Sequence, residues 1–215
     1  MPKTDTDETP TGGPRSRKGQ ATRLRLLESA KQVFAETGFL EARISDIADG
    51  AGLSHGSYYH YFDSKEAIFR EVAETQEALL TAPPDDGEPA DGEQTEYERI
   101  LRANRRYLER YRDNGRIMGV IEEVSRYDDQ VNQARMRRQK HFADRAERAI
   151  RRLQKAGQAD RGIDPEIAAL ALGSMVARFA ELWLIEQWGT YELEKVADQV
   201  TRLWANAIGL QAPAA

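Results

Sequence analysis

The 215-residue chain contains no cysteine, so it can form neither a disulfide nor a thiolate metal site. Histidine is scarce too: of the three residues, His55 and His60 have no glutamate between them and no third ligand nearby, so we predict no metal site. The first twenty residues lack the apolar core of a secretory signal, and no later apolar run approaches the length of a membrane span. These absences favour a cytoplasmic protein with no membrane partner and no cofactor.

Basic charge is in deficit, because 31 Lys and Arg against 36 Asp and Glu give a formal net charge of −5. Proteins that bind nucleic acids usually carry a basic footprint, so the total charge argues mildly against that function. The distribution matters more. Residues 15–70 contain nine basic and seven acidic residues, whereas residues 81–96 contain six acidic residues and no basic one. The acidity therefore lies outside the first third of the chain.

Strand-like alternation and repeats of fixed period are also absent. Helical periodicity predicts an all-α protein of about nine helices, covering 22–38, 44–51, 54–61, 63–80, 96–112, 116–126, 129–156, 164–188 and 191–209. Residues 1–20 are expected to be a disordered basic arm, either a solvated tail or a segment that neutralises phosphates. Residues 81–95 are rich in proline, glycine and acidic side chains, so we expect a mobile loop there.

The stretch "ISDIADGAGLSHGSYYHYF", residues 44–62, predicts two short helices separated by a tight turn. Isoleucine and alanine at helical spacing mark the first helix, and Gly52 ends it. Ser54 then stands where the second helix needs an N-cap. Two short helices joined by a glycine-containing turn form a helix-turn-helix, whose second helix can lie in the major groove of DNA.

The outer face of the second helix carries hydrogen-bonding groups and no negative charge. A glycine there lets the backbone approach a phosphate or a base edge, and imidazoles can meet base-edge acceptors. These outward positions are His55, Gly56, Tyr59 and His60. Hydroxyl groups that can donate to phosphate oxygens belong to Ser57, Tyr59 and Tyr61. The pattern therefore favours a surface that faces a DNA duplex.

The segment "RISDIADGAGLSHGSYYHYFDSKEAIFREV" resembles the DNA-binding signature of the TetR family of transcriptional repressors. That signature runs T-[VI]-x-x-[IL]-A-x-x-A-G-[VL]-S-x-G-x-[LY]-Y-x-[YH]-F-x-x-K-x-x-[IL], and the match covers residues 44–68. The upstream "LLESAKQVFAETGF" resembles the first helix of the family. One departure is Arg43, which stands where the family usually has Thr, so the customary N-cap is lost while a cation is gained.

The resemblance implies a role for individual side chains. Contacts to bases or to neighbouring phosphates would be made by Ser45, His55, Gly56, Ser57 and His60. Phosphate clamps would be Tyr59, Tyr61 and Lys65, with Arg43 as an additional cation. The implied domains are a three-helix DNA-binding domain over 21–66, a connecting helix over 67–80, and a helical ligand-binding and dimerisation domain over 96–210. In that last domain the final two helices would pair across a two-fold axis into a four-helix bundle.

Two sets of residues in the second half are candidates for assembly and sensing. The apolar helix over 164–188 and the apolar stripe that follows it suggest an interface that includes Trp188, Val200, Leu203, Trp204 and Ile208. Candidates for a pocket are Met118, Ile121, Met136, His141, Phe142, Met175, Phe179 and Trp183, with ordinary core packing as the alternative for each. Arginines of the middle helices, Arg105, Arg106, Arg137 and Arg138, are expected on a solvated face, with contact to an anionic ligand as the alternative.

The sequence thus predicts a homodimeric repressor that binds a palindromic double-stranded DNA operator and is released by a small, largely apolar effector. A constitutive DNA-binding regulator without a ligand, or an activator, are the alternatives. An enzyme is disfavoured because the three scattered histidines assemble no nucleophile with its base, and neither paired carboxylates nor a metal cluster is apparent.

Overall fold

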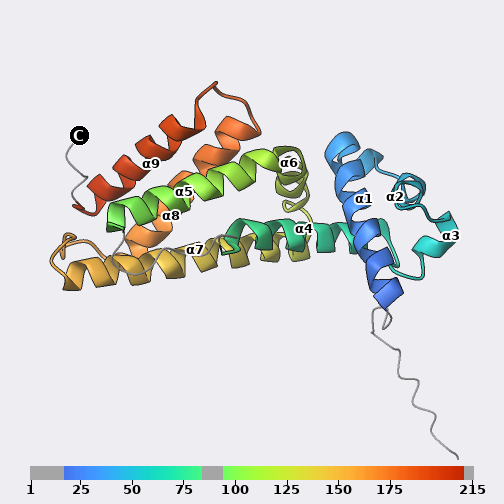
Figure 1. Cartoon of the computed structure of the whole chain (residues 1–215), viewed down its shortest axis with the longest axis horizontal. Helices are drawn as coiled ribbons and strands as arrows, with labels where there is room; N and C mark the ends of the chain where they lie inside the picture. Colours follow the sequence, from blue (N-terminus) through green and yellow to red (C-terminus); the bar gives the residue numbers. More distant parts are fainter. Residues whose placement is uncertain (1–16, 84–93, 211–215) are drawn as a thin grey trace, which may run out of the picture. The chain divides into compact units, whose positions relative to one another are not determined.

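The computed structural model describes residues 17–83 and 94–210, and these residues form nine α-helices and no strand (Figure 1). The predicted all-α fold with about nine helices is therefore confirmed. The helices are α1 (Arg17–Glu41), α2 (Ile44–Gly50), α3 (His55–Tyr58), α4 (Lys65–Thr81), α5 (Glu96–Asp113), α6 (Gly115–Val124), α7 (Asp129–Lys155), α8 (Pro165–Leu184) and α9 (Leu193–Ala207). The chain divides into two compact units, residues 1–72 and 73–215, so the division falls inside α4.

The first unit is built around a cluster of three phenylalanines on α1 and α4. Phe34 and Phe39 both meet the ring of Phe69 edge to face, with ring centroids 4.9 Å apart in each pair. Phe39 follows Gly38, whose φ of 79° breaks the helical path and turns the ring inward. Positive φ is strained for any residue with a Cβ, so the glycine is required at this turn.

Small residues let α2 pack closely on α1. The hydroxyl of Ser29 is buried and donates to the carbonyl oxygen of Ile47 at 2.8 Å. A Cβ at Gly50 would collide with that same hydroxyl, so glycine is needed here for packing. Ile47 and Ala48 are fully buried beneath the contact. α2 is therefore held through the face that carries its isoleucine and alanine side chains, in agreement with their helical spacing in the sequence.

Several helix ends differ from the sequence-based boundaries. Residues 17–20 belong to α1, so the arm predicted over 1–20 is wrong for its last four residues, and residues 1–16 lie outside the described part. α4 starts at Lys65, two residues after the predicted start at 63, because the hydroxyl of Ser64 accepts from the amide of Ala67 at 3.1 Å and caps the helix. Of the loop predicted over 81–95, residue 81 is helical and residues 84–93 lie outside the described part.

The second unit contains α5 to α9. α7 packs along α8, and α5 packs along α9, as Figure 1 shows for the green and red helices. Their shared core includes Ile150 and Leu153 from α7, Leu172 from α8, Trp204 from α9, and Ile208 directly after α9. The core thus joins the last three helices of the chain.

Side-chain caps fix the starts of three helices in this unit. The hydroxyl of Thr95 and the carboxylate of Glu98 form a reciprocal capping box at α5. Asp128 caps α7, and Asp164 caps α8 by accepting from two backbone amides at 2.9 and 3.0 Å, with Pro165 in the first turn. α8 ends at Leu184, four residues before the predicted end.

α8 is strongly apolar, with a mean hydropathy of 1.5 over 18 residues. Among the described helices it alone is long and apolar enough, by length and composition only, to cross a membrane. This corrects the expectation that no apolar run has that length. Core helices of globular proteins satisfy the same criterion, and α8 packs along α7. However, only 28% of the window is buried in the chain, so much of its apolar surface faces outward.

Candidate nucleic-acid interface

The turn between α2 and α3 is set by backbone hydrogen bonds and one glycine. The amide of Leu53 donates to the carbonyl of Ala48 at 2.9 Å, which closes the end of α2. Gly52 has a φ of 68°, the left-handed conformation that this type of helix end requires. Ser54 then caps α3, because its hydroxyl accepts from the amide of Ser57 at 3.2 Å. Both the stop at Gly52 and the cap at Ser54 agree with the sequence-based prediction.

Tyr58 anchors the inner face of α3. Its side chain is fully buried, and its hydroxyl donates to the carbonyl of Ser64 at 2.8 Å. Burial raises the pKa of the Tyr58 phenol above its usual range, and the nearby Tyr59 and Glu66 add to the shift, so the hydroxyl remains protonated and able to donate. With this anchor in place, a helix of only four residues is held in one orientation.

The outer face of α3 is open. His55, Gly56, Tyr59 and His60 are all exposed, and 46% of Tyr59 is accessible. The rings of His55 and Tyr59 meet edge to face with centroids 5.4 Å apart, so they present one aromatic surface. A Cβ added at Gly56 would meet no protein atom within 4 Å. Packing inside the protein therefore gives no reason for a glycine at this position.

The remaining predicted contacts on and near α2 and α3 are partly engaged. Ser57 and Tyr61 are half-buried, and the Ser57 hydroxyl lies 2.8 Å from that of Ser54. Ser45 is also half-buried, and its hydroxyl donates to the carboxylate of Asp46 at 3.2 Å. Arg43 is exposed at the N-cap of α2 and makes no side-chain capping bond, in agreement with the loss expected from the missing threonine.

Lys65 has a structural role that the sequence did not reveal. Its ammonium group donates to the carbonyl oxygens of Phe39, Leu40 and Ala42 at 2.8, 3.0 and 3.0 Å, and it lies 4.8 Å from the centre of the Phe39 ring. An ammonium has three N–H groups, and all three are engaged by these carbonyls. The prediction that Lys65 clamps a phosphate is therefore corrected: the side chain closes the end of α1.

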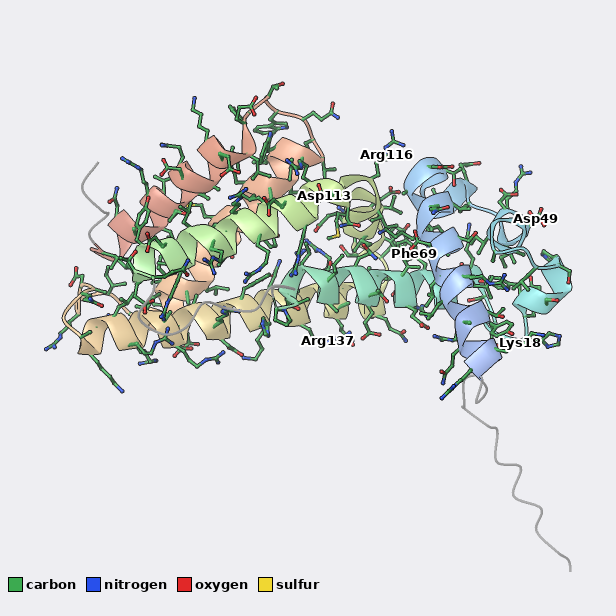
Figure 2. All side chains as sticks on the ribbon, in the orientation of Figure 1. Lys18, Asp49, Phe69, Asp113, Arg116 and Arg137 are labelled. Atoms are coloured by element: carbon green, nitrogen blue, oxygen red, sulfur yellow. The ribbon has the colours of Figure 1, made fainter. Side chains whose placement is uncertain are left out.

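Basic residues of α1 add to the candidate surface, two of them from the segment predicted to neutralise phosphates as one of its alternatives. Arg17 and Lys18 are exposed on its first turn, where no acidic residue accompanies them. Figure 2 labels Lys18 at this end of α1. Cations are unfavourable at the positive end of a helix, so they do not serve the stability of α1. The guanidinium of Arg25 reaches to 4.0 Å from the position of a Cβ at Gly52. Sequence patterns could not single out Arg25, because its proximity to the turn arises from the packing of α1 on α2.

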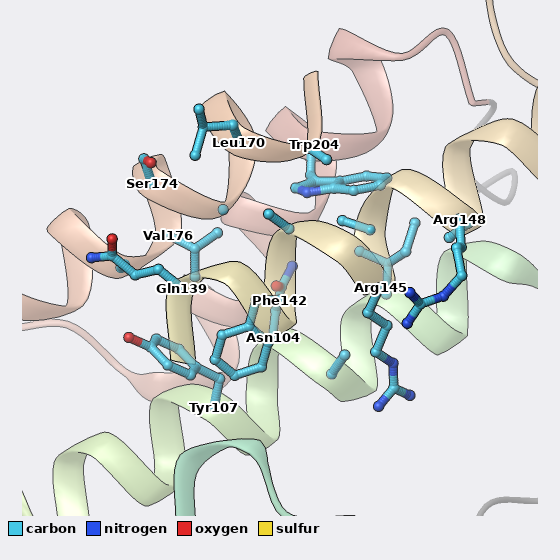
Figure 3. Close-up of a pocket in the computed structure, with 18 of the residues that line it drawn as sticks. Asn104, Tyr107, Gln139, Phe142, Arg145, Arg148, Leu170, Ser174, Val176 and Trp204 are labelled. Atoms are coloured by element: carbon cyan, nitrogen blue, oxygen red, sulfur yellow. The ribbon is translucent and has the colours of Figure 1, made fainter. Parts of the chain in front are cut away.

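The second unit contains a pocket of about 380 Å³ between α5, α7 and α8. Trp204 from α9 also lines this pocket, and the rings of Tyr107 and Phe142 meet edge to face in its wall, with centroids 5.4 Å apart. Figure 3 shows Arg145 and Arg148 on the side of Trp204, with Gln139 and Tyr107 on the opposite side. Small residues of the three helices make the space, namely Ala103, Ala143, Ala146, Ala149, Ala169, Gly173 and Ala177.

Of the residues predicted for a pocket, Phe142 lines this one and the others do not. Met118 and Ile121 are fully buried core residues, while His141 and Met136 are exposed. Met175 packs against the core formed by α5 and α7 to α9. Phe179 and Trp183 form an aromatic cluster with Tyr191, with centroids 6.2 to 6.3 Å apart. Residue type alone could not separate these roles, because methionines and aromatics also fill irregular cores.

The residues predicted for a dimer interface separate into two groups. Val200, Trp204 and Ile208 are at most 6% exposed within the single chain, so they cannot meet a partner, and this part of the prediction is wrong. They recur every four residues along α9 and just past its end, and their side chains are buried within the chain itself. Trp188 and Leu203 are 72% and 57% exposed and remain available for an interface.

A short second helix, held by a buried tyrosine behind a glycine turn and exposing hydrogen-bonding groups, defines a helix-turn-helix DNA-binding domain. Residues 26–72 match the family model described as bacterial regulatory proteins, tetR family. This stretch is therefore similar to the DNA-binding domain of the TetR family of transcriptional regulators.

Among curated proteins, the uncharacterized HTH-type transcriptional regulator YdgC of Bacillus subtilis is 47% identical over 55 residues, which are 26% of this chain and 28% of that protein. The HTH-type transcriptional repressor KstR2 of Rhodococcus jostii is 48% identical over 50 residues, 23% of this chain and 24% of that protein. These matches therefore span only about a quarter of the curated relatives.

The whole fold has counterparts among solved structures. A TetR-family transcriptional regulator from Syntrophomonas wolfei superposes with a TM-score of 0.68 over 91% of this chain and 99% of that chain, at 19% identity. At this identity the likeness establishes the fold and nothing about the ligand.

Proposed function

We infer that this protein is a transcriptional repressor that binds a palindromic DNA operator in the cytoplasm as a homodimer and releases it when a small molecule occupies the pocket. The observation that carries this proposal is the outer face of α3, where exposed hydrogen-bonding groups surround a glycine that packing does not require. Base edges in the major groove present acceptors and donors to such groups, and backbone phosphates accept from hydroxyls. The repressor function named for KstR2 supports the same role here.

Dimerisation follows from the length of α3. A reading helix of four residues contacts few base pairs, whereas two copies on a two-fold operator roughly add their contact energies. Outward apolar residues on α8, after it and on α9, namely Ile167, Trp188 and Leu203, are 57 to 72% exposed and would be covered by a second copy. We assign the interface to this surface of α8 and α9.

The pocket supports regulation by a ligand and disfavours the constitutive alternative. Operator release requires that the ligand prefer a conformation in which α3 no longer fits the groove, and a hundredfold loss of operator affinity needs about 2.7 kcal/mol of such preference. α4 is the element common to both units, because the division of the chain lies between Val72 and Ala73. No catalytic step is part of the proposed function.

Replacing Gly56 with alanine tests DNA binding directly. We expect operator affinity to fall at least tenfold, because the new methyl group stands on the surface that approaches DNA. Stability should stay equal or rise by up to about 1 kcal/mol, since the site is free of protein atoms and alanine favours a helix more than glycine does. The measurement is fluorescence anisotropy with a duplex selected from a random library by the wild-type protein, together with thermal unfolding.

The matched control is Gly173→Ala, also a helical glycine with no atom within 4 Å of a Cβ, but on α8. This variant should bind the duplex as the wild type does. Unchanged binding by Gly56→Ala would show that α3 does not approach DNA closely. Failure of the wild type to enrich any duplex at low salt would refute the DNA-binding function itself.

The dimer is tested by Leu203→Glu. A charge placed within a paired apolar surface is expected to convert the dimer into a monomer at micromolar concentration and to weaken operator binding with it. Sedimentation velocity measures the change in mass. Met136→Glu is the control, because Met136 on α7 is 55% exposed, close to the 57% of Leu203. If Leu203→Glu remains dimeric, another surface forms the interface.

A further inference from the structure

Two hydrogen-bond donors that line the pocket have no hydrogen-bond partner among the described residues, and the same is true of both carboxylate oxygens of Glu77, the ion-pair partner of one of them. The guanidinium of Arg138 has only 3% of its side chain exposed, and its Nη1 has no hydrogen-bond partner among the described residues. The same holds for the hydroxyl of Tyr107, a residue that is only 7% exposed. Both residues line the pocket. Arg138 was expected on a solvated face, so its burial corrects that prediction. A buried donor without an acceptor costs about 1–3 kcal/mol, more for a charged group.

These donors select the kind of group that can lie against them. A guanidinium donates and never accepts, so its partner must present a lone pair. Burial raises the pKa of Tyr107, which keeps the phenol protonated and able to donate. A carboxylate fits best, because its two oxygens can accept from both donors and its charge strengthens the bonds.

The charge and the walls of the pocket complete the description of its ligand. The charged lining residues are five arginines and one glutamate, in a chain with a net charge of −5: Arg99, Arg138, Arg145, Arg148, Arg152 and Glu96. Such a ring attracts an anion. Between these charges the walls are alanine, leucine, valine, phenylalanine and tryptophan side chains, which suit an apolar body. The volume of about 380 Å³ lies at the small end of ordinary ligand sites.

We propose that the pocket binds a small apolar carboxylate whose oxygens accept from Nη1 of Arg138 and from the hydroxyl of Tyr107. This inference specifies the ligand of the regulator proposed above and rests on that function only for its effect on DNA. It also identifies the contact through which the ligand reaches α4. Arg138 pairs with Glu77 of α4, with Nε and Oε2 3.0 Å apart, so the bound carboxylate competes with Glu77 for one guanidinium.

Calorimetric titration of the full chain without DNA tests the ligand class. The probes are octanoate and decanoate, each paired with the primary alcohol of the same length. We expect the carboxylates to bind at least tenfold more tightly than the alcohols. Tyr107→Phe should weaken carboxylate binding about threefold or more without lowering the melting temperature. Gly173→Leu, whose side chain would enter open space in the pocket, should abolish binding of both probes.

A gain of affinity provides a result that misfolding cannot mimic. Glu77→Gln removes the competing charge, so carboxylate affinity should rise at least threefold, whereas Glu74→Gln on the exposed side of α4 should leave it unchanged. Alcohols that bind as tightly as carboxylates, or equal affinities in Tyr107→Phe and wild type, would overturn the inference. If the wild-type protein binds the duplex but neither carboxylate, the proposed ligand class is refuted and the DNA-binding function is not. Carboxylate affinity that is unaffected by the operator refutes ligand-controlled DNA release alone.

Discussion

Glu77→Ala is expected to lower the free energy of unfolding by about 3–5 kcal/mol, because removal of one partner leaves the other charge buried and uncompensated. The carboxylate of Glu77 and the guanidinium of Arg138 are each 3% exposed and 3.0 Å apart, joining α4 to α7 within the second unit. Burial raises the pKa of the Glu77 carboxyl, and the positive charge of Arg138 opposes that shift. Urea denaturation followed by circular dichroism measures the decrease in stability.

The chain provides a matched control three residues earlier on the same helix. Glu74 pairs with Arg137 of α7 at 2.6 Å, but these side chains are 65% and 58% exposed. Exposed pairs contribute about 0–1 kcal/mol, so Glu74→Ala should be nearly silent. The double variant Glu77→Leu/Arg138→Met should recover most of the stability that Glu77→Ala removes, because an apolar pair avoids the desolvation of two charges. Equal small effects in both single variants would show that the Glu77 pair is not buried.

The second large effect is expected from Lys65→Met. The variant removes three hydrogen bonds from a charged donor to backbone carbonyls, and it leaves these carbonyls at the end of α1 to water. Bonds to charged groups contribute about 1.5–3 kcal/mol each, but the lysine is half-exposed and one cation serves all three, so we expect a total of about 2 kcal/mol. The first unit should therefore unfold at a lower temperature, as seen by thermal denaturation.

Salt dependence distinguishes this structural role from the binding of a phosphate. When a variant removes one protein–phosphate interaction, the slope of log K against log salt becomes shallower by roughly 0.9. Lys65→Met should leave the slope unchanged at temperatures where the domain is folded. Arg43→Met should make the slope shallower with little change in stability, because Arg43 is exposed and makes no capping bond. A stable Lys65→Met variant with a shallower slope would restore the phosphate-clamp prediction.

Local chemistry explains why the first unit was largely predictable. Gly52 and Ser54 act on their immediate neighbours, through a left-handed φ and a bond to an amide three residues away. Such patterns can be recognised without knowledge of the rest of the fold. Lys65 is different, because its acceptors are 23 to 26 residues away, and nothing in the sequence distinguishes a lysine that meets carbonyls from one that meets phosphates.

The second unit was harder to predict, because an apolar helix face can pack either within its own chain or against a partner. The sequence predicts an apolar stripe on α9. In the structure Val200 and Trp204 are buried within the chain, whereas Leu203 is exposed. Periodicity indicates where a stripe lies on the helix but not which surface covers it. The pocket shows the same limit: Phe142 lines it, while Met118 lies in the core.

Capping, glycine turns and helical periodicity act over a few residues, and for that reason the all-α fold, the helix-turn-helix and the family could be inferred without any coordinates. Helix packing decided that Lys65 closes a helix, that Arg138 is buried beside Glu77, and that small residues of three helices leave a pocket between them. These features depend on distances between residues far apart in the chain, and such distances are fixed only when the helices pack together.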